Sequence, residues 1–161
     1  MNGISFRHWP ILILALAVVS FTGACSSDRD SPEDRVRAMI GQGEAAAEKK
    51  ETGVLRRLIS EKYTDSQGQD KRAIEAILRY YFLRNESIHL LTRIRQITIP
   101  NPDSAQAILL VAMAGQPISG PEQLERIRAD LHHFELSLSR EDGEWKVIRA
   151  EWRRAEFADF L

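Results

Sequence analysis

The chain has 161 residues, which is the length of one ordinary domain. Hydrophobic residues make up 43% of it and charged residues 28%, a composition typical of globular proteins and unlike that of disordered or fibrous ones. The formal net charge is −1, because 22 basic residues are balanced by 23 acidic ones, so the charge balance does not support a basic footprint for nucleic acid, and we expect no nucleic-acid partner.

The first 24 residues have the three parts of a secretory signal peptide. Arg7 supplies the positive charge of the head, residues 9–21 (WPILILALAVVSF) are almost wholly apolar, and small residues follow at 22–24. The apolar stretch is shorter than the roughly 20 residues that a membrane-spanning helix needs. We therefore expect residues 1–24 to be removed after export.

Cys25 is the only cysteine of the chain and follows these small residues directly. The sequence Thr22-Gly23-Ala24-Cys25 resembles the lipobox of bacterial lipoproteins, although a lipobox usually has Leu or a similar aliphatic residue where Thr22 stands. The resemblance implies a lipid anchor on Cys25, and Ser26 in place of an Asp favours the outer membrane, facing the periplasm, over the inner membrane. The alternative is a buried, inert thiol. Residues 25–30 then form the lipidated end and a polar tether, and the folded domain is expected over 31–161.

Three helices are predicted after the tether. The first covers 31–50, because a capping serine, a proline and two acids precede apolar residues at spacings of three and four. A short second helix is predicted at 54–59, and the polar residues 61–69 contain turn formers. Asp70 opens the third helix, which ends near residue 85. Its apolar stripe consists of Ile74, Ile77, Leu78, Tyr81 and Phe82.

Four strands are predicted from residue 88 onward, where the spacing ceases to be helical. They cover 88–99, 105–114, 132–139 and 145–154. Slips in the alternation predict irregularities near residues 95–96 and in the last strand. The apolar run 105–114 fits a central strand covered on both sides, with a helix as the alternative, and a short helix is predicted at 122–128. Helices followed by mainly antiparallel strands predict an α+β fold in which the helices cover the sheet.

The order of these elements and the hairpin Asp142-Gly143-Glu144-Trp145-Lys146-Val147 resemble the nuclear transport factor 2-like superfamily, which includes SnoaL-like and ketosteroid-isomerase-like domains. The resemblance covers roughly residues 34–154. It implies a curved sheet that wraps a helix as a cone, a pocket between the helices and the concave face, and often a homodimer. It does not imply an enzyme, because isomerases, cyclases and dehydratases share this fold with members that only bind or assemble.

Tyr63, Asp65 and His132 are the candidate catalytic residues, because the resemblance implies an Asp, His or Tyr inside the cone of enzymatic members. His132 is in phase with the apolar residues of its strand, so we expect it to point inward, where it can serve as an acid or base. The alternative is a core or rim histidine. Tyr63 and Asp65 lie near the expected mouth of the cone, and their alternative role is that of turn and capping residues.

The sequence predicts no metal site and no cofactor. His132 and His133 point to opposite faces of one strand, and His89 is the only other histidine after the leader. Residues 65–70 (DSQGQD) resemble a calcium loop only superficially, because the distal Glu is missing. The sequence also contains no glycine-rich phosphate loop and no nucleophile motif.

The sequence therefore favours a lipid-anchored, non-catalytic domain that binds a small apolar ligand or a protein partner in the cell envelope. The first alternative is a pocket enzyme that performs acid–base chemistry through His132 or Asp65. The second is an assembly component that meets another envelope protein through the outer face or the edge of its sheet. To that outer face we assign Glu135, Ser137, Arg149 and Glu151.

Overall fold

The computed structural model of the protein describes residues 31–160, so the predicted signal peptide and Cys25 lie outside the described residues. The helices are α1 (Pro32–Glu48), α2 (Thr52–Leu58) and α3 (Lys71–Arg84), and the strands are β1 (His89–Asn101), β2 (Ser104–Ala114), β3 (Asp130–Glu141) and β4 (Glu144–Arg154). Two short 3-10 helices complete the elements, η2 (Pro121–Gln123) and η3 (Phe157–Phe160). This order confirms the prediction of an α+β fold. No helix within residues 31–160 has the length and apolarity to cross a bilayer.

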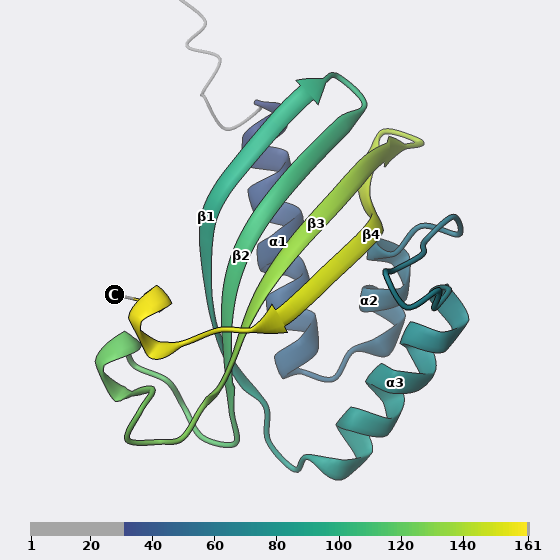
Figure 1. The fold of residues 1–161 in the computed structure, drawn as a ribbon. Helices are drawn as coiled ribbons and strands as arrows, with labels where there is room; N and C mark the ends of the chain where they lie inside the picture. Colours follow the sequence, from purple (N-terminus) through teal and green to yellow (C-terminus); the bar gives the residue numbers. More distant parts are fainter. Residues whose placement is uncertain (1–30, 161) are drawn as a thin grey trace, which may run out of the picture.

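The four strands form one antiparallel meander in the order β1-β2-β3-β4. The irregularity expected in β1 is present, since its register with β2 shifts between Ile94 and Gln96. The slip expected in the last strand appears where β3 pairs with β4, at Ser137 and Leu138. Such irregularities bend strands and increase their twist. The resulting sheet is curved, and α1 lies along its concave face (Figure 1).

The helix starts follow from the predicted caps. The Ser31 hydroxyl oxygen accepts a hydrogen bond from the backbone N–H of Asp34 at 3.1 Å. At α3, the Asp70 carboxylate accepts from the N–H of Ala73 at 2.9 Å. Each cap satisfies an N–H that has no partner within the helix, so both helices begin where the sequence predicts.

α1 fills one half of the concave face with large side chains. Val36, Met39 and Ile40 pack against a core that includes Leu138 and Trp145. Further along α1, two carboxylates reach edge strand β1. Glu44 accepts from the N–H of Thr92 at 3.1 Å, and Glu48 accepts from the N–H of Leu90 at 2.8 Å. These bonds satisfy backbone donors of an edge strand and fix α1 to the sheet.

A second core covers part of the convex face of the sheet. Leu110 and Ala112 of β2 pack there with Leu124 and Phe160, which come from the segments after β2 and β4. The Arg93 guanidinium donates a hydrogen bond to the carbonyl of Phe160 and holds η3 in place. Strand β2 is therefore covered on both faces, as its apolar run predicts.

Two local predictions are wrong. The helix expected over 122–128 is one 3-10 turn followed by turns, with Arg128 at a positive φ of 52°. Leu124 is the one fully buried side chain in this stretch, so no apolar stripe holds a longer helix against the sheet. In α3, Ile77 is 47% exposed although it belongs to the predicted stripe, whereas Lys71 is only 8% exposed. The cause is that α3 packs mainly on α2, and the Lys71 ammonium finds partners in the loop after α2.

Replacing Leu138 by Ala tests the core beneath α1. Leu138 is 1% exposed, so the truncation is expected to lower the free energy of unfolding by about 2–5 kcal/mol. Leu83→Ala is the matched control, because Leu83 is 87% exposed, and its effect is expected to stay within about 0.5 kcal/mol. Urea unfolding followed by circular dichroism measures both, and equal effects would contradict this description of the core.

Candidate functional site

A cavity of about 310 Å³ lies between α1, α2 and the concave face of the sheet. Among the described residues that line it, only Glu44, Tyr63 and Thr92 have polar side chains. The others are apolar or glycine and come from all three helices and all four strands. Central among them are Gly43, Leu58, Ile74, Val111 and Phe134. The arrangement provides an apolar chamber open on one side.

The polar groups of the cavity differ in whether they are free to form a hydrogen bond with a ligand. One Glu44 oxygen already accepts the N–H of Thr92. Tyr63 is 5% exposed, and burial raises the pKa of its phenol to about 12, with a further upward contribution from the charge of Asp65 and an opposing one from Arg149. The phenol is therefore neutral at physiological pH and can donate one hydrogen bond.

Asp65 lies in the loop after Tyr63 but does not line the cavity. Its Oδ1 accepts from the N–H groups of Gln67 and Gln69, both at 2.8 Å, which is the turn geometry given above as its alternative role. Its Oδ2 is buried and has no hydrogen-bond partner among the described residues, and the same holds for Oε1 of Gln69. The side chain as a whole is only 4% exposed.

His132 lies on the concave face, opposite Val111 of β2 and Arg154 of β4. Its ring centroid is 6.0 Å from that of Phe134, yet it does not line the cavity. Burial lowers the pKa of His132, Asp130 opposes this shift, and Arg154 adds to it. Tyr63 and Asp65 thus lie in one loop, whereas His132 lies on the sheet, outside the lining of the cavity.

The residues assigned to the outer face of the sheet are on that face. Phe134 and Ala150 line the cavity, and strand alternation turns their neighbours outward. Glu135 pairs with Glu151 and Ser137 with Arg149, and an ion pair of 2.8 Å joins Arg149 to Glu151. This part of the convex face is polar.

A second hollow, which the sequence does not predict, has a volume of about 740 Å³. It lies between α1, α2 and the turn that joins β3 to β4. We call it the basic groove, because five cations and two acids line it. The cations are Arg35, Arg56, Arg57, Lys71 and Lys146, and the acids are Glu61 and Glu144. These residues are spread over 112 positions of the chain, from 35 to 146, so no local motif marks them.

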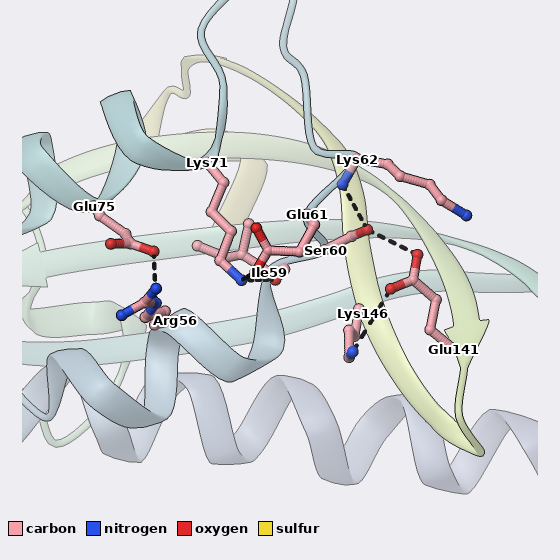
Figure 2. A network of polar contacts seen from close by, with 9 residues as sticks. All are labelled: Arg56, Ile59, Ser60, Glu61, Lys62, Lys71, Glu75, Glu141 and Lys146. Atoms are coloured by element: carbon pink, nitrogen blue, oxygen red, sulfur yellow. Dashed lines mark hydrogen bonds and ion pairs between the residues drawn. The ribbon is translucent and has the colours of Figure 1, made fainter.

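A network of polar contacts joins the loop after α2, which lines part of this groove, to the sheet (Figure 2). Ser60 is fully buried, donates a hydrogen bond to Glu141 at 2.8 Å and accepts one from the N–H of Lys62. Lys146 approaches the other oxygen of Glu141 at 3.6 Å. The N–H of Ser60 also donates to the carbonyl of Val147 at 3.0 Å. The loop after α2 is thereby bound to the β3–β4 hairpin.

The buried Lys71 ties α3 to the same loop (Figure 2). Its ammonium donates to the carbonyl of Ile59 and to the carboxylate of Glu61, both at 2.8 Å. The hydrogen bond and charge of Lys71 lower the pKa of Glu61. An ion pair of 3.2 Å between Arg56 and Glu75 joins α2 to α3 directly. No group of three or more His, Cys, Asp or Glu side chains in the described part is arranged to hold a metal ion.

Comparisons with known proteins show what this architecture is similar to. No protein-family model matches the chain, and no curated protein matches it. The solved structure described as "Putative Scytalone Dehydratase" from Novosphingobium aromaticivorans matches with a TM-score of 0.64 and 14% identity, over 77% of this chain and 84% of that one. A nuclear transport factor 2-like protein of unknown function from Shewanella oneidensis matches with a TM-score of 0.58 and 12% identity, over 76% and 98% of the two chains. The chain has the nuclear transport factor 2-like fold.

Bd1075 from Bdellovibrio bacteriovorus also matches, with a TM-score of 0.58 and 12% identity over 75% of this chain. The match covers 40% of Bd1075, so this chain spans less than half the length of that protein. The structural similarity to these proteins, at identities of 12–14%, shows the fold alone and confirms the expected cone of helices and curved sheet. It does not transfer chemistry, which must be argued from this chain's own residues.

Replacing His132 by Gln tests its environment. Because burial lowers the pKa of His132 in the folded state, the unfolded chain binds the proton more readily. The free energy of unfolding is therefore expected to fall as the pH decreases below about 6.5, the ordinary histidine pKa, towards the lower folded value. Urea titrations from pH 7.5 to 5 should show a weaker decline for His132→Gln than for the unaltered chain.

The matched control for this experiment is His133→Gln, on the opposite face of the same strand. It is expected to keep the full decline. If His133→Gln flattens the pH profile and His132→Gln does not, the stated environment of His132 is wrong.

Proposed function

We propose that the protein is a lipid-anchored cell-envelope protein whose nuclear transport factor 2-like domain binds a small apolar ligand between α1 and the sheet. The observation that carries the proposal is the cavity of about 310 Å³ with almost wholly apolar walls. Ligand pockets commonly range over about 300–1,000 Å³ and are mainly apolar with a few polar groups. This cavity lies at the small end, so its ligand is one with one or two ring systems or one short chain.

The energy of binding comes from apolar contact. Transfer of apolar surface from water is favourable by about 25 cal/mol per Å². Walls such as Val111 and Phe134 offer a water molecule few hydrogen-bond partners, so water competes weakly for this space. Tyr63 can donate one hydrogen bond to an oxygen of the ligand and orient it.

Binding fits the polar groups of the cavity better than acid–base catalysis does. A general acid or base works best when its pKa lies near the working pH. The pKa of Tyr63 is about 12, and Glu44 is engaged by the backbone of β1. Asp65 and His132 lie outside the lining. These positions support a non-catalytic role.

The anchor in this proposal is lipid on Cys25, in the outer membrane and facing the periplasm. The described domain begins at Ser31, so five residues separate it from the anchoring cysteine. A chain of that length spans at most roughly 20 Å. A lipidated Cys25 would therefore keep the domain close to the membrane surface.

Filling the cavity from α1 tests the binding role. A Cβ at Gly43 would meet only Leu58, at 3.5 Å, so Gly43→Leu fits the helix backbone and directs its methyl groups into the cavity. The probe is N-phenyl-1-naphthylamine, an uncharged fluorophore whose emission rises in apolar surroundings. We expect it to bind the full chain and to bind Gly43→Leu at least roughly tenfold more weakly, which corresponds to about 1.4 kcal/mol.

Gly41→Leu is the matched control, because Gly41 lies on the exposed side of the same helix and a Cβ added there would meet nothing within 4 Å. Both substitutions raise helix propensity equally, so they differ only in the cavity. Gly41→Leu is expected to bind the probe normally. Absence of binding by the unaltered chain, or equal binding by both variants, would contradict the proposal.

Cys25→Ser tests the anchor. Intact-mass spectrometry of the protein extracted from its native membrane is expected to show acyl chains on a product that begins at Cys25. The Cys25→Ser variant is expected to lack them and to leave the membrane fraction, because stable anchoring requires two or more chains. An unmodified cysteine in the unaltered protein would contradict the anchor and leave the cavity argument intact.

A further inference from the structure

The apolar cavity and the basic groove share a wall. Met39 of α1 and Leu58 of α2 line both hollows. Both belong to the packing between α1 and the sheet, and Met39 is 9% exposed. Methionine is unbranched with three rotatable side-chain bonds, so it adapts readily to a new neighbour. The wall that the charged hollow shares with the apolar one therefore includes two apolar side chains, of which Met39 adapts readily.

The groove has a surplus of positive charge among the residues that line it. Three of its cations are paired, Arg56 with Glu75, Lys71 with Glu61 and Lys146 with Glu141. Arg35 and Arg57, which are exposed, have no ion pair among the described residues. Of the two acids that line the groove, Glu144 also has no ion pair among the described residues. Two guanidinium groups against one carboxylate leave a net charge suited to an anion.

The chemistry of these donors defines the anion. A guanidinium presents paired N–H groups that match the oxygens of a carboxylate or a phosphate. The Lys71 ammonium adds a donor, because it has three N–H bonds and, within residues 31–160, hydrogen-bonds only Ile59 and Glu61. Ala38, Met39 and Trp145 add apolar surface to the lining of the groove. The groove thus offers cationic contacts together with apolar ones, and it shares Met39 and Leu58 with the cavity.

We propose that the two hollows form one site for a single-chain anionic amphiphile. Its carboxylate or phosphate head lies in the groove between Arg35 and Arg57, and its apolar chain passes Met39 and Leu58 into the cavity. The inference rests on the proposed function, since it assigns a ligand class to the same cavity. The volume of about 310 Å³ suits one short chain rather than the two chains of a phospholipid.

Calorimetry with four ten-carbon probes tests the assignment on the full chain, below the micellar concentration of each probe. Decanoate carries a carboxylate, decyl phosphate a phosphate, decanol no charge and decyltrimethylammonium a positive charge. We expect at least one anionic probe to bind roughly tenfold more tightly than decanol, and the cationic probe to bind most weakly. The tighter of the two anions identifies the head group.

The double variant Arg35→Gln with Arg57→Gln is expected to bind the preferred anion no more tightly than decanol, while its affinity for decanol is unchanged. The matched control is Arg37→Gln with Arg72→Gln, which removes the same charge from exposed positions that do not line the groove. This control is expected to retain the preference for the anion.

Gly43→Leu tests whether the two hollows act as one site. Filling the cavity is expected to weaken binding of the preferred anion at least tenfold, although the substitution lies outside the groove. Undiminished anion binding by Gly43→Leu would show two independent sites and overturn the inference. Equal affinities for decanol and both anions would also overturn it, with the apolar binding role intact. Failure of all four probes to bind would overturn the inference, and the proposed function would then depend on whether N-phenyl-1-naphthylamine binds.

Discussion

The packing of α1 along the concave face of a curved sheet is the interaction on which the rest of this structure depends. At the start of α1, the side chains of Val36, Met39 and Ile40 fill the space between the helix and the sheet. At Gly43 the inward position has no side chain, and this leaves space in the cavity that Met39 and Ile40 also line. The hydrogen bond that the Glu44 carboxylate accepts from the N–H of Thr92 joins the helix to β1 beside the cavity. The cavity is thus a consequence of a change from large to small side chains along one helix face.

Polar contacts hold the remaining walls in place. The buried Ser60 and Lys71 fix the loop after α2 to the β3–β4 hairpin and to α3 (Figure 2). Because buried polar groups are costly without partners, these bonds specify one arrangement of α2 and α3 over the sheet. The same arrangement gathers Arg35 and Arg57 in the groove that shares a wall with the cavity. The fold itself accommodates many functions, so it is this juxtaposition of charge and apolar space that supports an amphiphile as the ligand.

Features set by local sequence could be predicted, and features set by tertiary contact could not. The caps at Ser31 and Asp70 and the hairpin turn at Gly143 depend on residues close in the chain, and the structure has all three. The phase of His132 is also predictable, but its place outside the cavity lining depends on how the helices cover the sheet. The burial of Lys71 depends on carbonyl and carboxylate partners supplied by another segment. The basic groove draws on α1, α2, α3 and the hairpin, so no sequence window contains its pattern.

An apolar chamber beside Gly43, open to ligands, is the central claim, and a crystal structure under xenon pressure tests it most directly. Xenon binds apolar cavities through dispersion contacts and needs no polar partner. The predicted result is xenon density in contact with Gly43, Val111 and Phe134. Density for side chains that fill this space, with xenon absent from it, would contradict the claim.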